Sequence, residues 1–180
     1  MTLTIRASML PGYTDCARRT AARQFQTMIE GAGFPLRQLA PNIAAVIGTA
    51  MHRAVAMVLE CGGREQPVTA IDAMVMTAFQ GDCAWDKTTP DADTARAQVV
   101  RMVASLRTIL RATKPALIEH PMKATLARGW ELTGTLDMED ADGCIVDWKS
   151  GARIRPYHAQ HGAYSLLRQS EGAKPSNLLQ

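Results

Sequence analysis

The most regular hydrophobic pattern in this sequence runs from Asn42 to Cys61. Apolar residues recur there at i, i+3, i+4 and i+7: Ile43, Val46, Ile47, Ala50, Met51, Ala54, Val55, Val58 and Leu59. This spacing predicts an amphipathic helix. His52 lies at the margin of the apolar stripe, one turn beyond Gly48, and a glycine there would let another segment come close. A histidine in such a position is more often a surface or core residue than a ligand, so the pattern alone leaves both roles open.

Weaker helical patterns lie on either side. Ser8 as a cap and Pro11 in the first turn predict a helix that continues to about Glu30. Two further helices are predicted over residues 69–80 and about 93–113, and Pro115 ends the second of these.

The pattern then changes from helical to alternating. Residues 130–139 and 144–149 predict two short antiparallel strands, joined by a tight turn in which Gly143 suits a left-handed position. Residues 116–126 predict a strand that leads into this hairpin. Helices, then strands, then a last helix near Pro156 predict an α/β fold, in which helices cover a short mixed sheet.

The hairpin carries a possible site. If its loop is residues 141–143, Asp137 lies across from Asp147, with β-carbons about 4.5–5.5 Å apart. Two carboxylates at that distance repel each other unless a cation lies between them, and Lys149 shares a strand face with Asp147. An Asp-x-Lys tripeptide is common by chance, so a solvated strand face and a divalent-metal site are both compatible with this pattern. A slip of one residue would remove the geometry.

Composition narrows the class of protein. The 180 residues are enough for one domain with a real core, and 47% hydrophobic and 21% charged residues are ordinary for a globular protein. A net charge of +3 is compatible with a polyanionic partner. No signal peptide and no uninterrupted apolar stretch of 18 residues occur, so no membrane span is expected. The four cysteines form no C-x-x-C pair, which indicates reduced thiols in a cytoplasmic protein.

Basic residues gather at two places. Arg18, Arg19 and Arg23 lie in the first predicted helix, and Arg153 and Arg155 follow the hairpin. Such residues are either an ordinary solvated face or contacts to a phosphate backbone.

Taken together, the sequence resembles the RecB-type branch of the PD-(D/E)xK nucleases, which is similar to the CRISPR-associated exonucleases. The matching residues, in the family's order, are Ser8, Cys16, Arg18 and Arg19; Gly48, Thr49 and His52; Gly134 and Asp137; Asp147, Lys149, Ser150 and Gly151; and Gln160 and Tyr164. They span nearly the whole chain. The resemblance implies a single nuclease domain over residues 1–180 with a restriction-endonuclease-like core: a mainly helical part over 1–115, and the catalytic strands and following helix over 116–180.

The resemblance also implies a site. Asp137, Asp147 and Lys149 would be catalytic, and Mg²⁺ or Mn²⁺ would be held by His52, Asp137, Asp147 and the main-chain carbonyl of Trp148. A nitrogen ligand favours Mn²⁺ somewhat. The implied DNA-contacting residues are Arg18, Arg19, Arg153, Arg155, Gln160 and Tyr164.

Two departures from the family pattern matter. Ala17 stands where the family usually has proline, and the three further cysteines of cluster-containing members are missing after the last helix. No iron–sulfur cluster is therefore expected, and Cys16 is expected to be a packed thiol. Relatives often continue with another strand, so a minimal nuclease, a fragment and half of an assembly are all compatible with an end at Gln180.

Three functions remain open from sequence. The first is an exonuclease that acts on free ends of double- or single-stranded DNA in recombination, repair or phage replication. The second is an endonuclease of restriction or junction-resolving type. The third is a DNA-binding module without catalysis, against which the intact set of His52, Asp137, Asp147 and Lys149 counts. A homo-oligomer or a recombination or helicase partner is compatible with each.

Overall fold

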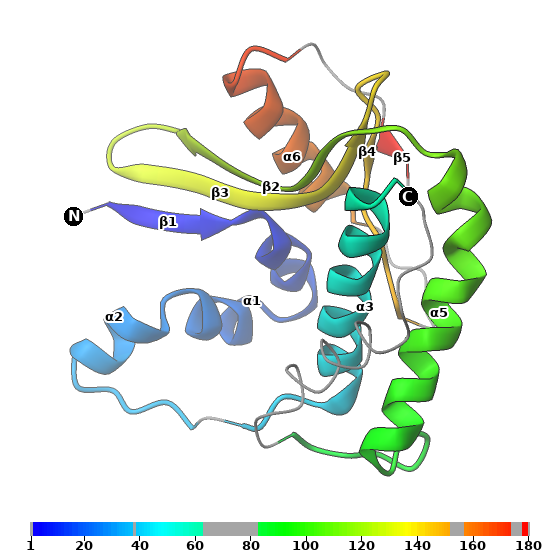
Figure 1. Cartoon of the computed structure of the whole chain (residues 1–180). Coiled ribbons are helices and arrows are strands. Elements are labelled where there is room, and N and C mark those ends of the chain that lie inside the picture. Colours follow the sequence, from blue (N-terminus) through cyan, green and yellow to red (C-terminus); the bar gives the residue numbers. More distant parts are fainter. Residues whose placement is uncertain (1, 38, 63–82, 152–156, 174–177, 180) are drawn as a thin grey trace.

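The computed structural model describes residues 2–37, 39–62, 83–151, 157–173 and 178–179 (Figure 1). Its elements in chain order are β1 (Leu3–Arg6), the 3-10 helix η1 (Ala7–Met9), α1 (Leu10–Gln24), α2 (Gln26–Gly31), α3 (Ile43–Glu60), α5 (Ala92–Ala112), β2 (Pro115–Thr125), β3 (Trp130–Asp140), β4 (Ile145–Val146), α6 (His158–Ser170) and β5 (Leu178–Leu179). The helix predicted over residues 69–80 lies outside the described residues.

The sheet is built around β3. Along one edge β3 pairs antiparallel with β2 over nearly its whole length. Along the other edge it pairs parallel with β1 in its first half and antiparallel with β4 at its end, and β5 continues the sheet beyond β4. The prediction of an α/β fold with a short mixed sheet flanked by helices is confirmed.

The hairpin has the register on which the sequence argument depended. Met138 pairs with Val146, and Glu139 with Ile145. One step further in the same register, Asp147 lies beside Asp137. The turn is closed by the Asp140 side chain, whose Oδ1 accepts the Cys144 N–H at 2.8 Å.

Helices cover both faces of the sheet (Figure 1). α3 and α5 enclose one core on one face, with Met138 as the contribution of β3. α6 encloses the other with β2, β3 and η1. α3 begins where predicted, because the Asn42 side chain accepts the Ala45 N–H at 2.8 Å and so caps the helix. By length and composition α3 could cross a membrane, but 56% of it is buried inside the protein, as expected of a core helix.

A backbone irregularity lies where the two cores meet. Leu136 belongs to the core under α6, whereas Met138, two residues further along β3, belongs to the core under α3 and α5. Side chains two apart on a regular strand share a face, so the strands must twist locally between these positions. Glu119 lies opposite Asp137 there, between the pairs Ile118–Met138 and His120–Leu136. Its φ of 47° is in the left-handed region that side-chain-bearing residues rarely occupy.

α6 is fixed to the sheet by charge and by a close approach. Arg168 donates two hydrogen bonds to the buried Glu139 carboxylate, at 2.6 and 2.8 Å. At Gly134, a β-carbon would come within 2.9 Å of the Tyr164 ring and 3.2 Å of Leu167. Only glycine lets α6 lie this close to β3, which sets the position of the helix relative to the hairpin.

The N-terminal prediction is incomplete in one respect and wrong in two. Residues 3–6 form a strand that was not predicted, because four residues are too few to show a clear alternating pattern. The predicted single helix is divided into α1 and α2 at Phe25. Within α1 the backbone leaves the helical region at Cys16 (φ −152°, ψ 96°), and this cysteine is exposed rather than packed.

Candidate metal centre

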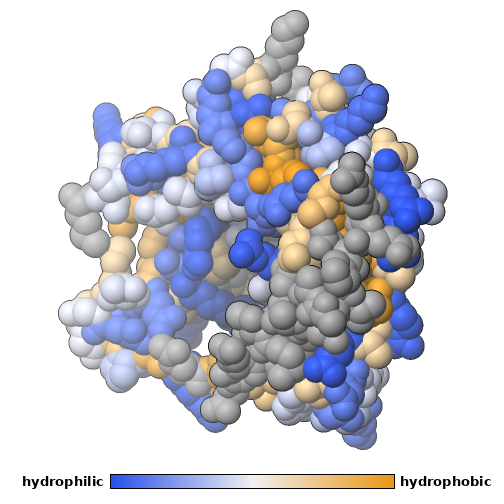
Figure 2. Space-filling model, in the orientation of Figure 1, coloured by the Kyte–Doolittle hydropathy of each residue, from blue (hydrophilic) through white to orange (hydrophobic). Residues whose placement is uncertain are grey.

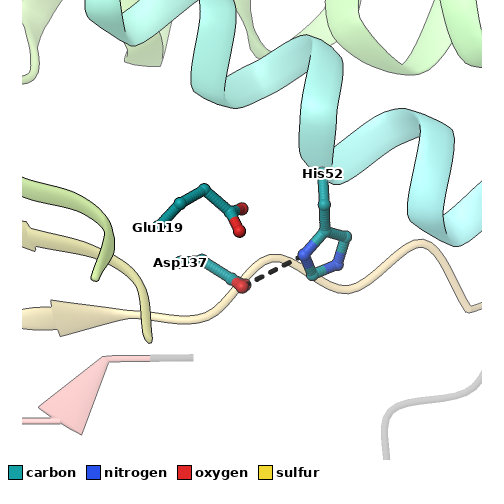
Figure 3. A group of neighbouring side chains, drawn as sticks. All are labelled: His52, Glu119 and Asp137. Carbon is teal, nitrogen blue, oxygen red and sulfur yellow. Dashed lines mark hydrogen bonds and ion pairs between the residues drawn. The ribbon is translucent and has the colours of Figure 1, made fainter. Parts of the chain in front are cut away.

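Three side chains from three elements converge beside the hairpin. His52 extends from α3, Glu119 from β2 and Asp137 from β3, and Figure 3 shows them pointing toward one another. One ligand atom of each lies within 4.8 Å of the other two. The His52 Nδ1 is 3.1 Å from Asp137 Oδ1.

These residues fit a divalent cation. Two carboxylates and an imidazole are ligands that Mn²⁺ accepts, and carboxylate oxygens are the ligands that Mg²⁺ prefers. Adjacent ligand atoms around a six-coordinate ion with bonds of about 2.1 Å lie about 3 Å apart, and opposite ones about 4.2 Å apart. The 3.1 Å between His52 and Asp137 is in this range, and the 4.8 Å limit on the other separations is slightly above it, so one ion could bind the three residues after a small rearrangement.

The electrostatics of the site favour a cation. Burial and the neighbouring Asp137 charge raise the pKa of Glu119. Burial lowers the pKa of His52, but its hydrogen bond with Asp137 and the charge of that residue outweigh burial, so the pKa is raised overall. A cation between these groups would replace the protons that these shifts favour.

The second acidic residue of the hairpin has a different environment. The Asp147 side chain is only 2% exposed, and its Oδ2 lies 2.6 Å from Lys149 Nζ. From α6, Gln160 Nε2 lies 3.5 Å from Oδ1 and His161 Nε2 lies 3.4 Å from Oδ2. Burial raises the pKa of Asp147, and the Lys149 ammonium opposes this shift.

The backbone connects the two acidic positions. The Trp148 N–H donates to Asp137 Oδ2 at 2.7 Å, so the residue after Asp147 holds the carboxylate of β3. On the other side, Gly48 of α3 leaves room for Ser150: a β-carbon at Gly48 would be 3.1 Å from the Ser150 hydroxyl oxygen. The segment that carries Lys149 therefore lies against the helix that carries His52.

The structure brings most of the predicted catalytic and metal-binding residues together. His52 and Asp137 are in direct contact, Lys149 pairs with Asp147, and the Trp148 backbone contacts Asp137. Asp147 is adjacent to Asp137 in register but lies outside the compact cluster of ligand atoms.

The predicted DNA-contacting residues lie in three different environments. Gln160 and Tyr164 are buried and joined by a 2.8 Å hydrogen bond, so they lie beneath the site rather than along a surface path. Arg18 and Arg19 are exposed on α1, and Arg19 pairs with Asp15. Hydrophilic residues predominate over the part of the surface where α1 and α2 lie (Figure 2). Arg153 and Arg155 lie outside the described residues.

Sequence reasoning missed two residues of this centre. Glu119 was expected only as part of a strand, because its role depends on the pairing of β2 with β3. His161 carried no signal beyond its place next to Gln160. A search for acidic residues opposite Asp137 on both neighbouring strands would have found Glu119. A search of the helical turn that contains Gln160 would have found His161.

Glu119 of β2, Asp137 of β3 and Asp147, one residue beyond β4, thus lie side by side, with Lys149 next to Asp147. A family model, described as the PD-(D/E)XK nuclease superfamily, matches residues 5–178. The chain belongs to this superfamily. No curated protein and no solved structure gives a significant match.

Proposed function

We propose that the protein is a metal-dependent deoxyribonuclease of RecB type that acts as an exonuclease on DNA ends. The observation that carries the proposal is the convergence of His52, Glu119 and Asp137 next to the Asp147–Lys149 pair, in a chain of the nuclease superfamily. The exonuclease assignment is supported by the order of the sequence motifs, which is that of the RecB-type branch.

The residues of the chain have separable roles in this proposal. His52, Glu119 and Asp137 would hold Mg²⁺ or Mn²⁺, with Asp147 and the Trp148 carbonyl as further ligands. The bound ion supplies an activated water molecule and neutralises charge that develops on the phosphoryl group.

Lys149 acts beside the ion. Its ammonium, held at 2.6 Å from Asp147 Oδ2, is placed to orient the attacking water and to stabilise the negative charge of the transition state. Asp147 keeps that ammonium in place. The Trp148 N–H orients the Asp137 carboxylate, so its remaining oxygen can face His52 and the ion.

The exposed arginines of α1 would contact the DNA backbone. Arg19 forms an ion pair with Asp15, whereas Arg18 forms none with an acidic residue in the part of the chain that the structure describes. Contacts to phosphates position a strand without reading its sequence. The four cysteines are free thiols, which supports a proposed cytoplasmic location.

One experiment separates the two nuclease functions. Purified protein is incubated with linear and with covalently closed circular plasmid, each with Mn²⁺, with Mg²⁺ and with EDTA. An exonuclease degrades the linear DNA progressively and leaves the closed circle intact, whereas an endonuclease nicks or linearises the circle. No cleavage of either form with both metals would contradict the proposed function.

Two variants connect cleavage to the site. Asp147→Ala and Lys149→Ala should abolish cleavage and leave the circular dichroism spectrum unchanged. Asp142→Asn is a matched control, because Asp142 is an exposed acid in the turn of the same hairpin. Undiminished metal-stimulated degradation by Asp147→Ala protein would overturn the assignment.

A further inference from the structure

Two rings at the start of α6 contact the two members of the Asp-x-Lys pair. The Lys149 Nζ lies 4.5 Å from the centroid of the Tyr157 ring. The His161 Nε2 lies 3.4 Å from Asp147 Oδ2. Tyr157 and His161 are one helical turn apart, and their ring centroids are 6.5 Å apart. One pair of packed rings therefore touches both residues.

We propose that this ring pair, Tyr157 and His161, positions Lys149 and Asp147 for catalysis. The proposal rests on the nuclease function proposed above and adds two positioning residues to it. Neither ring touches the groups that would react, so both act through the residues they contact.

His161 is unusual among the histidines of the chain. All four are described, and it is the one that is buried, at 6% exposure. A buried polar ring needs a hydrogen-bond partner, and Asp147 provides one. The tautomer with its proton on Nε2 donates to Oδ2, the oxygen that Lys149 also contacts. With Gln160 on Oδ1, both oxygens of the carboxylate then have a partner on α6.

Tyr157 contacts the ammonium group of Lys149. A lysine side chain has four rotatable bonds, so an ammonium attached to Asp147 alone can still rotate away. The face of an aromatic ring attracts a cation at centroid distances below about 6 Å. Tyr157 thus gives Lys149 a second contact and restricts the ammonium to a position between the ring and Asp147.

A merely structural role for these rings makes a different prediction. If His161 only fills space, leucine should serve as well as histidine. If it orients Asp147, a side chain with a donor at the same reach should serve, and leucine should not. The same reasoning distinguishes phenylalanine, which keeps the ring face, from leucine at Tyr157.

The experiment compares these substitutions in the full chain. His161→Leu and His161→Gln, and Tyr157→Leu and Tyr157→Phe, are assayed for kcat and KM on end-labelled linear DNA. Mn²⁺ binding is measured by calorimetry, and folding by thermal unfolding. His158→Leu is the control, because His158 is an exposed histidine on the same helix.

Removal of a group that orients a metal ligand typically reduces metal affinity or activity by about 10–100-fold. We expect a loss of that size in kcat for His161→Leu, with KM for DNA within about twofold of wild type, and recovery of most of the loss in His161→Gln. Tyr157→Leu should lose several-fold in kcat, and Tyr157→Phe should stay close to wild type. His158→Leu should match wild type throughout.

The outcomes separate this inference from the proposed function. Wild-type kcat in both leucine variants overturns the inference, as does a loss that glutamine and phenylalanine fail to recover in folded protein. If the wild type cleaves no DNA, Mn²⁺ binding decides: a tenfold weaker affinity in His161→Leu but not in His161→Gln supports positioning by His161, and equal affinities overturn it. If His161→Leu does not fold, the Tyr157 pair decides in the same way by kcat.

Discussion

Glu119 and Asp137 lie directly opposite each other on β2 and β3, and the backbone of Glu119 is in the left-handed region at a φ of 47°. This conformation costs a residue with a side chain about 1–2 kcal/mol. It also brings a second carboxylate to Asp137. In the metal-free protein, both the backbone and the charges are therefore unfavourable at a position where a cation would compensate, as is common at functional sites.

Removal of the Glu119 charge should stabilise the metal-free protein and weaken metal binding. The pKa of Glu119 is raised, so the folded state binds this proton more tightly than the unfolded state. Folding stability is then lost as the pH rises above the ordinary value of 4.5. We expect Glu119→Gln to raise the Tm in EDTA by a few degrees at most at pH 7.5, with no gain at pH 4, and to weaken Mn²⁺ binding more than tenfold.

Glu119→Gly tests the strain separately. Glycine relieves about 1–2 kcal/mol of backbone strain and costs about 0.5–1 kcal/mol in chain entropy, so this variant should be at least as stable as Glu119→Gln. Arg128, at a φ of 44° in the turn before β3, is the matched control. Arg128→Gly should gain stability and leave Mn²⁺ affinity unchanged. A lower Tm in EDTA for Glu119→Gln would contradict the proposed repulsion.

Metal binding and cleavage should increase with pH. The pKa values of His52, Glu119 and Asp147 are all raised, and each group must lose its proton to act as a ligand. Protons therefore compete with the metal up to a pH above 6.5, the ordinary pKa of histidine. Single-turnover rates at fixed Mn²⁺ should rise through this range, and each tenfold increase in Mn²⁺ should lower the midpoint by about one pH unit if one proton is displaced, and by about half a unit if two are. A midpoint that is independent of Mn²⁺ would show that another group controls the rate.

The sequence predicted the parts of this molecule that depend on local pattern. The apolar periodicity of α3, its start near Asn42 and the three-residue hairpin loop are short-range features, and the structure has all of them. The register of the hairpin placed Asp137 beside Asp147 because a tight turn fixes which residues face each other.

The missed features depend on long-range pairing. Glu119 joins the site through the pairing of β2 with β3, and neither strand alone indicates its partner. Gln160 and Tyr164 were expected at a surface, but α6 lies so close to β3 that both are buried. That close approach depends on Gly134. The place of Gly134 in the sequence motif does not indicate how near α6 lies to β3.

Gly134→Ala should therefore separate α6 from the sheet. The added methyl group would lie 2.9 Å from the Tyr164 ring and 3.2 Å from both the Ala7 β-carbon and a Leu167 methyl group. Overpacking of this kind costs about 1–3 kcal/mol, which corresponds to a decrease in Tm of roughly 2–10 °C. Cleavage should also fall, because Tyr164 supports Gln160 beneath Asp147.

Gly162→Ala is the control for this prediction. Gly162 is exposed in the same helix, and no atom lies within 4 Å of an added β-carbon. Alanine should stabilise α6 by about 0.5–1 kcal/mol. Thermal unfolding of the two variants should thus give shifts of opposite sign, and a loss of stability in both would indicate that the helix itself, and not its contact with β3, is the sensitive feature.

Arg18 should contribute to DNA affinity without contributing to sequence preference. It is exposed on α1, and a phosphate contact releases counterions from the DNA, so each lost contact reduces the slope of log K against log salt by about 0.9. We expect Arg18→Ala, in an Asp147→Ala background that prevents cleavage, to bind several-fold more weakly at low salt, by the same factor for unrelated sequences. Arg128→Ala is the control, because Arg128 lies before the start of β3 at Trp130. Trp130 is seven residues before Asp137, which is about 23 Å along a strand that rises about 3.3 Å per residue. Fluorescence anisotropy across a salt series measures both slopes, and an unchanged slope in the Arg18 variant would mean that this face of α1 does not contact DNA.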